Sequence, residues 1–297
     1  MNFLFVDQLL SFELGQGARG IKHVTAYDTY LAPSESGKPV LSSCIVGEAL
    51  GQLCSWYVIK ATDVKVRPVA GIVAEVNIFG QAYLGDTIEL TVRVEQLDEQ
   101  AVNWHGEAKV RGQTILIVKN SIGPCLPMVD FNDPDEVRWQ LKMIDRPDNL
   151  RAFVEGQAVI PDHINYYPEL TCFDNILSWN TGEKIVAQKN ISIIAPYFAD
   201  HFPRKPVLPI TILLETKLQL AQRFLIDLLG NNAAKRFYPS KVSNIKMKDF
   251  VLPGQTLVTA LTLKASSENH FVFTFRSEIN KKIICTAEAE FRSYESS

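Results

Sequence analysis

The sequence predicts an α+β protein made of two similar halves, each with one long buried helix wrapped by an antiparallel sheet. The chain has 297 residues, about twice the length of a typical domain. Its second half repeats the first at a shift of 167 residues. Both halves also show the same order of patterns: short strands, a proline-bearing loop, one long apolar segment and a series of alternating strands.

The repeat can be read directly from the sequence. FVDQLLSFELGQGARGIKHVT overlies CFDNILSWNTGEKIVAQKNIS without a gap, and GKPVLSSCIVGEALGQL overlies RKPVLPITILLETKLQL. Residues 7–59 share sixteen identities with their counterparts, whereas ordinary composition gives roughly three by chance. The two halves therefore arose by duplication.

The elements of each half follow from local patterns. The first strands meet at turns marked by Gly15 and Gly182, and prolines then end regular structure in the loop that follows. We expect helices over 41–60 and 208–229, whose apolar residues lie on most sides, as is typical of a buried helix. Strand patterns fill the remainder, from VAGIVAEVNIFG to QTILIVKNSI and from KVSNIKMKDF to KIICTAEAEF.

We place the first half at 1–125, a connector at 126–157 and the second half at 158–297. The connector breaks the strand pattern with NDPDE, RPD and scattered charges. Asp133 followed by Pro134 predicts the start of a short helix, because aspartate caps helices and proline is favoured at the first helical position.

Composition excludes several classes of protein. A net charge of −3 argues against a nucleic-acid partner. Five scattered cysteines contain no C-x-x-C pair, and no histidine has metal-ligand spacing, so we expect neither a disulfide framework nor a metal. The N-terminus lacks the basic region of a signal peptide, and no apolar run spans a membrane. We therefore expect a soluble, cytoplasmic protein.

The second half contains FADHFPRKPVLPITILLE at 198–215, in which His201 precedes Glu215 by fourteen positions. This segment resembles the signature of the β-hydroxyacyl-acyl-carrier-protein dehydratases, the hot-dog-fold enzymes of fatty-acid synthesis. Their pattern is G-H-F-P-G-x-P-x-M-P-G, followed by an apolar helix that carries an acid at the same spacing. The resemblance implies two hot-dog folds in one chain, arranged as an internal pseudo-dimer.

The chemistry of dehydration requires a base that takes the proton beside the carbonyl and an acid that assists departure of hydroxide. Histidine and a buried carboxylic acid suit these roles. In the family, each site combines the histidine of one subunit with the acid of the other. Carried onto the two halves, this pairs His201 with Glu48. The second combination pairs Glu215 with Ser34, and since serine is no base near neutral pH, we expect that site to be degenerate.

The resemblance also implies residues that bind the substrate. The helix start at Pro209 and Ile210 corresponds to the family's carbonyl-binding N–H groups, and Phe202 and Arg204 are further substrate-binding candidates. Ile210 and Arg204 replace glycines of the family pattern.

Two roles for Arg204 and its neighbour Lys205 stay open: contact with the carrier's phosphopantetheine phosphate, or solvated loop charges. Gln52 lies one turn beyond Glu48, a spacing that fits support of the carboxylate.

We therefore expect a dehydratase that acts on 3-hydroxyacyl thioesters of acyl carrier protein, in fatty-acid or polyketide-type synthesis. No cofactor is implied, because the carrier brings its own phosphopantetheine. One alternative is a hot-dog thioesterase or enoyl hydratase, and another is a non-catalytic protein that binds acyl carriers. The family stacks its dimers, so the resemblance is also compatible with a homo-oligomer of the fused unit.

Overall fold

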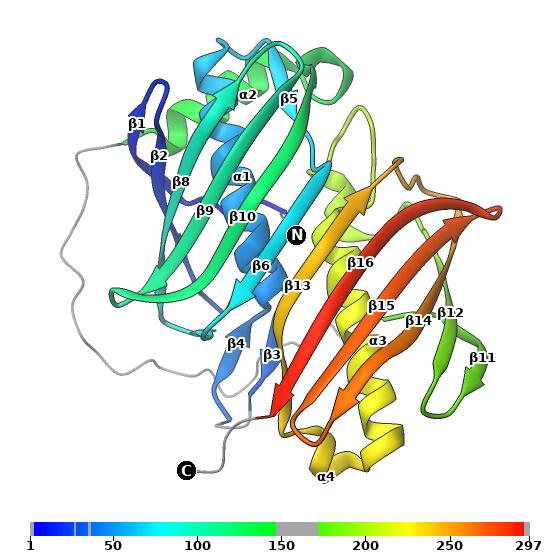
Figure 1. The fold of residues 1–297 in the computed structure, drawn as a ribbon. Helices are drawn as coiled ribbons and strands as arrows, with labels where there is room; N and C mark the ends of the chain where they lie inside the picture. The colour runs from blue at the N-terminus through cyan, green and yellow to red at the C-terminus, as the bar shows by residue number, and fades with distance from the viewer. Residues whose placement is uncertain (1–2, 27, 35–36, 147–171, 294–297) are drawn as a thin grey trace.

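Two long helices, each behind an antiparallel sheet, organise the protein (Figure 1). The computed structural model describes residues 3–26, 28–34, 37–146 and 172–293. The helices are α1 (Ser43–Ala61) and α3 (Ile210–Leu229), which pack against each other. Both predicted helices are thus confirmed, with their starts two residues later than expected.

The strands follow the predicted order. Those of the first half are β1 (Gln8–Glu13), β2 (Gly17–His23), β3 (Leu31–Pro33), β4 (Pro39–Leu41), β5 (Val66–Pro68), β6 (Ile72–Ile78), β7 (Ala82–Tyr83), β8 (Thr87–Leu97), β9 (Ala101–Val110) and β10 (Gln113–Pro127). Those of the second half are β11 (Asn175–Asn180), β12 (Lys184–Asn190), β13 (Phe237–Met247), β14 (Thr256–Ser267), β15 (His270–Ile279) and β16 (Lys282–Ser293). A short helix, α4 (Asn231–Ala234), follows α3. The predicted turns hold Gly15 at φ +80° and Gly182 at φ +79°, a backbone conformation that favours glycine.

The sheets of the two halves are continuous with each other. The strand order is β1-β2-β8-β9-β10-β6-β13-β16-β15-β14-β12-β11, with β5 beside β10, and β3, β4 and β7 form a separate small sheet. The halves meet where β6 pairs antiparallel with β13. The local sequence patterns predicted the strands of each half, but not that β6 would pair with β13.

The junction has the symmetry of a dimer interface. The equivalent turns at Gly85 and Gly254 show that this part of the repeat has a shift of 169 residues. That shift equates Val73 with Val242 and Val76 with Ile245. In the sheet, Val73 pairs with Ile245 and Val76 with Val242. Val73 thus faces the counterpart of Val76, and Val76 faces the counterpart of Val73, as across a two-fold axis.

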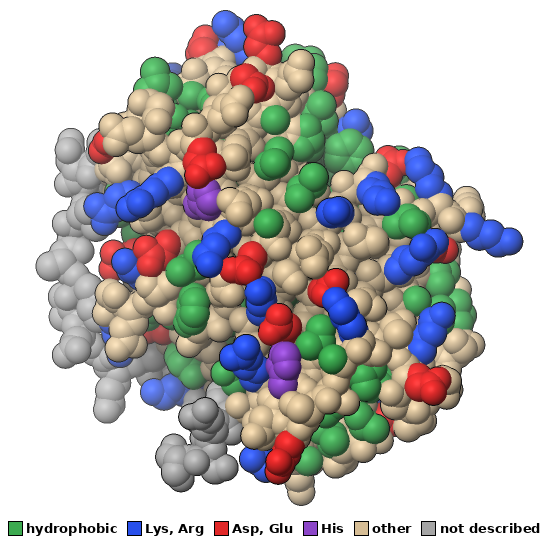
Figure 2. All heavy atoms as spheres, viewed as in Figure 1, with side chains coloured by type: hydrophobic (Ala, Val, Ile, Leu, Met, Phe, Trp, Pro, Cys, Tyr) green, Lys and Arg blue, Asp and Glu red, His purple; other side chains and the backbone are tan. Residues whose placement is uncertain are grey.

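The outer face of the sheet is polar. Acidic and basic side chains are interspersed over it (Figure 2). At the junction, Glu75 of β6 pairs with Lys241 of β13 at 2.8 Å and with Lys119 of β10 at 3.0 Å. Such solvent-exposed ion pairs contribute little to stability, so burial on the inner face holds the halves together.

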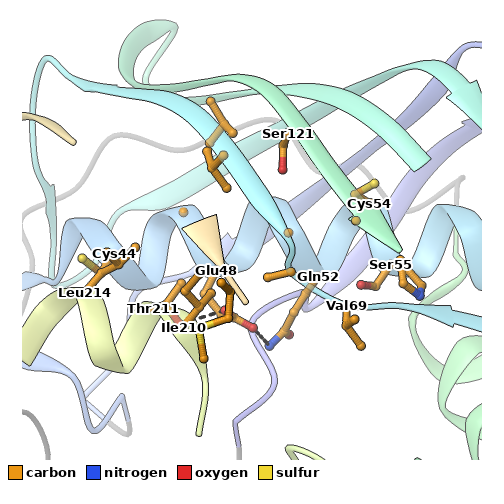
Figure 3. A pocket seen from close by; sticks show the side chains of 18 of the residues that line it. Cys44, Glu48, Gln52, Cys54, Ser55, Val69, Ser121, Ile210, Thr211 and Leu214 are labelled. Atoms are coloured by element: carbon orange, nitrogen blue, oxygen red, sulfur yellow. Dashed lines mark hydrogen bonds between the residues drawn. The ribbon is translucent and has the colours of Figure 1, made fainter. Parts of the chain in front are cut away.

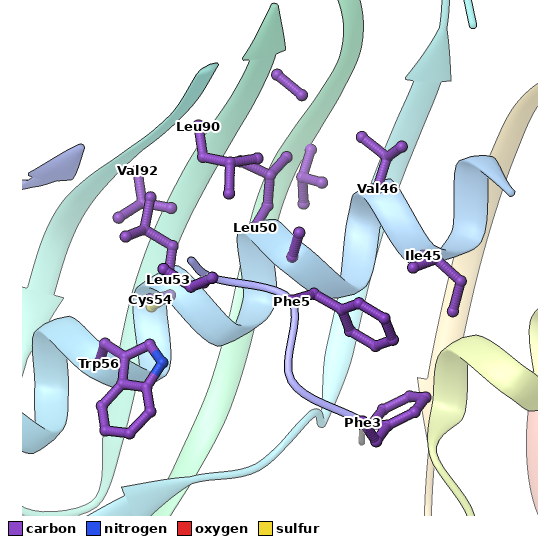
Figure 4. Close-up of a cluster of buried hydrophobic side chains, with 14 of the residues drawn as sticks. Phe3, Phe5, Ile45, Val46, Leu50, Leu53, Cys54, Trp56, Leu90 and Val92 are labelled. Carbon is purple, nitrogen blue, oxygen red and sulfur yellow. The ribbon is translucent and has the colours of Figure 1, made fainter. Parts of the chain in front are cut away.

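That inner face buries α1. Leu50 and Leu53 of the helix are fully buried, and they pack in one cluster with Leu90 and Val92 of β8 (Figure 4). The N-terminal segment crosses the helix and buries Phe3 in the same cluster. Removing a leucine side chain from such a core costs about 2–5 kcal/mol. Packing, rather than helix propensity, therefore stabilises α1.

The described part of the connector contains a 3-10 turn, η1 (Met128–Asp130), and the helix α2 (Pro134–Ile144). The Asp133 carboxylate accepts a hydrogen bond from the Asp135 N–H at 2.9 Å, which confirms the predicted cap. The predicted boundary between 157 and 158 lies outside the described residues. The helices that are described include none with the length and apolarity needed to cross a membrane.

Candidate active site

Glu48 lies on α1 with both carboxylate oxygens hydrogen-bonded (Figure 3). Gln52 Nε2 donates to Oε1 at 2.9 Å from one turn further along the helix, and Thr211 Oγ1 of α3 donates to Oε2 at 2.8 Å. Burial raises the pKa of Glu48, and these two bonds and the charge of Arg67 partly oppose the rise. The Thr211 bond joins the acid to the other half of the chain.

His201 follows a 3-10 turn, η3 (Pro196–Ala199), in the proline-bearing loop of the second half. Its Nδ1 lies 3.1 Å from the carbonyl oxygen of Val207. Because a carbonyl oxygen only accepts, Nδ1 carries the proton and the neutral ring presents Nε2 as a base. Burial lowers the pKa of His201 to about 4, so the imidazole is neutral at physiological pH.

The N-terminal segment connects the surroundings of these two residues. The Phe3 N–H donates to Asp200 Oδ2 at 2.8 Å, and the Phe3 ring meets the His201 ring edge-on at 5.4 Å. Gln52 accepts from the Phe5 N–H at 2.8 Å and donates to the Phe3 carbonyl at 3.1 Å. One extended segment thus contacts the histidine loop of one half and the helix of the other.

His201 and Glu48 line the same cavity, which has a volume of about 170 Å³. Its walls come from α1, the first turn of α3, and the strands β5, β6, β9, β10 and β13. Most of this lining is apolar, including Val76, Trp104 and Ile245. The structure therefore brings the predicted pair into the lining of one largely apolar cavity.

The other predicted site residues divide into two groups. Phe202 and Ile210 line the cavity, but Pro209 and Arg204 are not part of its lining. Pro209 stands at the N-cap of α3, where no side chain caps the helix. The start of α3 thus lacks a side-chain cap at Pro209, and the partial positive charge of a helix start favours negative groups.

Arg204 contacts the connector. Its guanidinium pairs with Asp133 at 2.8 Å, and its N–H donates to the carbonyl of Phe131 at 3.0 Å. The Lys205 ammonium lies over the rings of Phe131 and Phe250, at 5.0 and 4.6 Å from their centres. Both basic residues thus hold the connector and neighbouring loops against the histidine loop, and a role toward substrate for Arg204 stays a prediction.

The expected degenerate site repeats part of the Glu48 arrangement outside the cavity of His201 and Glu48. Glu215 accepts from Ser42 Oγ at 2.5 Å and from Gln219 Nε2 at 3.4 Å, which repeats the Glu48 arrangement across the pseudo-two-fold axis. Ser34 lies in the loop after β3, where its N–H donates to the Lys38 carbonyl. Neither Ser34 nor Glu215 lines the cavity of His201 and Glu48.

Sequence reasoning missed several polar residues of the cavity, among them Thr211 and Arg67. Thr211 holds Glu48 from the opposite half, and Arg67 of β5 is a cation in the lining. The signal for Arg67 was a charge between apolar Val66 and Pro68 on a short strand. Among the described residues, no group of three or more His, Cys, Asp or Glu side chains is arranged to hold a metal.

Comparison with known proteins identifies the family. A model of the FabA-like domain matches residues 1–119 and 166–288, so the chain belongs to this family. The 3-hydroxyacyl-acyl-carrier-protein dehydratase FabZ of Xanthomonas oryzae pv. oryzae is 33% identical over 134 residues, which are 44% of this chain and 85% of that protein. FabZ of Xylella fastidiosa is likewise 33% identical, over 138 residues that are 46% of this chain and 84% of the relative.

Solved structures confirm the fold. The dehydratase domain of PpsC from Mycobacterium tuberculosis has a TM-score of 0.57 at 12% identity, with 99% of this chain and 100% of that chain covered. A putative oleoyl thioesterase from Lactobacillus plantarum has a TM-score of 0.55 at 12% identity, with coverage of 94% and 96%. These likenesses confirm the α+β class and two hot-dog folds arranged as an internal pseudo-dimer.

Proposed function

We propose that the protein is a hydro-lyase that removes water from a 3-hydroxyacyl thioester carried by acyl carrier protein, giving the 2-enoyl thioester. The observation that carries the proposal is the meeting of His201 and Glu48, from opposite halves, in one apolar cavity. The FabZ relatives and their printed activity support the reaction class. Fatty-acid or polyketide-type synthesis is the setting in which such substrates arise.

The reaction needs a neutral His201 and a protonated Glu48, and burial shifts the pKa of each residue toward that state. Neutral His201 takes the proton from C2, and the electron pair of that C–H bond forms the C2–C3 double bond. The C3–O bond breaks, and protonated Glu48 gives its proton to the departing hydroxyl, which leaves as water. Burial favours both starting states, because it shifts the pKa of an acid upward and that of an imidazole downward.

The uncapped start of α3 supports the removal of the C2 proton. Negative charge develops on the thioester oxygen as the C2 proton leaves, and the backbone N–H of Ile210, at the uncapped start of α3 in the cavity lining, is the proposed donor to it. The isoleucine side chain lines the cavity in place of the family's glycine. Since the N–H belongs to the backbone, this replacement keeps the donor.

The test is turnover of short 3-hydroxyacyl groups on acyl carrier protein. Enoyl absorbance and free thiol are followed together, so that dehydration and thioester hydrolysis are distinguished. We expect enoyl formation without thiol release, and a loss of at least about 100-fold in His201→Ala and in Glu48→Gln. Thiol release would overturn the proposal in favour of a thioesterase, and absence of any turnover in favour of a binding protein. Full activity in both folded variants would overturn the roles of His201 and Glu48.

A further inference from the structure

Arg67 is a cation within the lining of the same cavity. It lies on β5, where it pairs with Leu126 of β10. Its Nε is buried and has no hydrogen-bond partner. An arginine side chain has five N–H donors in a fixed planar arrangement and accepts nothing, so an unmatched donor here requires an acceptor from elsewhere.

The residues around Arg67 place it beside the reacting pair. Its guanidinium carbon lies 4.3 Å from the centre of the Phe202 ring, and that ring stacks on His201 at 4.1 Å between centres. The Glu48 oxygens accept from Gln52 and Thr211. Burial lowers the pKa of Arg67 to about 10, and Glu48 opposes this shift when it is ionised. The guanidinium therefore remains charged at neutral pH.

Arg67 is partly buried and its buried Nε donor is unmatched, which is costly, whereas a charge-assisted bond to an anionic oxygen satisfies both the charge and the donor. We infer that Arg67 is an anion-binding residue of the cavity, which holds a negatively charged oxygen of the bound acyl group beside His201 and Glu48. The inference rests on the proposed function, in which the thioester oxygen acquires such a charge. The ligand class is an acyl group with an anionic oxygen near its head.

Binding without turnover tests this role. Octanoate and octanamide have the same chain and differ in the charge of the head group, and calorimetry measures both on the full chain. We expect octanoate to bind about tenfold more tightly to the wild type, as one charge-assisted bond implies. Arg67→Met should bind the two equally, and Arg67→Lys should keep part of the preference.

Arg138→Met is the matched control, because Arg138 lies on α2, pairs with Asp135 and does not line the cavity. It should keep the full preference for octanoate. Equal binding of the two probes by the wild type, or an unchanged preference in folded Arg67→Met, would overturn the inference. Thermal melts establish folding, and Arg67→Gln replaces the methionine variant if that one is unfolded.

The binding result is independent of whether the proposed reaction occurs. If no substrate is dehydrated, the proposed function fails while the preference for octanoate still decides the role of Arg67. If dehydration is observed, Arg67→Met should lower kcat with little change in KM, and lysine should restore part of it. Loss of the octanoate preference with an unchanged kcat would limit Arg67 to binding and overturn its link to the thioester oxygen.

Discussion

Two neighbouring residues have opposite pKa shifts from one cause. Burial raises the pKa of Glu48 and lowers that of His201 to about 4. The same desolvation acts in opposite directions because the neutral form is protonated for a carboxylic acid and deprotonated for an imidazole. The same desolvation therefore favours a protonated Glu48 and a neutral His201.

The pH dependence of kcat/KM follows from these shifts. Activity should rise as the pH increases through about 4, where His201 loses its proton. It should fall as the pH increases further, through the raised pKa of Glu48, where the acid loses its proton. Initial rates over a wide pH range measure both limbs. An acidic limb at the ordinary imidazole value of about 6.5 would contradict this prediction.

Thr211→Val removes the hydrogen bond that the second half gives to Glu48. Without this donor, the carboxylate is less stable, so the alkaline limb of the pH profile should move upward. The loss of one charge-assisted bond should lower kcat/KM about tenfold. Thr216→Val is the control, because the buried Thr216 hydroxyl donates to the Ile212 carbonyl. If both variants shift the limb equally, the effect does not come from contact with Glu48.

At the scale of the element, α1 combines burial with open space. Four small residues at intervals of four lie along one face and line the cavity: Ser43, Gly47, Gly51 and Ser55. A Cβ atom added at Gly47 or Gly51 meets nothing within 4 Å. The helix can therefore pack against the sheet elsewhere while this face leaves room for a chain.

Gly47→Ala should stabilise the protein but restrict its substrates. Alanine in place of glycine inside a helix adds about 0.5–1 kcal/mol to the free energy of unfolding. The new methyl group enters the cavity, so KM should rise more for long acyl chains than for short ones. Denaturant unfolding and a chain-length series measure the two effects.

Gly230→Ala is the matched control for that variant. Gly230 also has open space around it, but its φ of +83° disfavours alanine. This variant should therefore lose stability and leave the chain-length preference unchanged. A gain in stability from both changes would contradict the distinction.

At the scale of the whole molecule, only the site of His201 is expected to work. Ser34→His in a His201→Ala background restores the missing histidine to the counterpart loop. We expect no recovery of activity, because Glu215 is held by Ser42 and does not line the cavity. Turnover assays of the double variant beside His201→Ala decide this. Recovery would show that the second site lacks only its base.

The sequence alone predicted both long helices and the two residues, His201 and Glu48, that the structure places in one cavity. Long apolar segments bounded by prolines located the helices, and the fourteen-residue spacing within a repeated chain led to His201 and Glu48. Arg67 had only a weak local signal, a charge between Val66 and Pro68, because the pairing of β5 with β10 is a tertiary contact that the sequence pattern does not indicate. The register of β6 against β13 also depends on tertiary packing, so no local pattern indicated it.

The junction of β6 with β13 also changes how the protein responds to dilution. A dimer of separate hot-dog chains loses its partner at low concentration, and its apparent stability depends on how much protein is present. Here one chain supplies both sides of the junction, so the counterpart is always present at a high effective concentration. Each half also mutates independently of the other. Symmetry no longer requires that both sites survive, and one loop could exchange its histidine for serine while the other kept it.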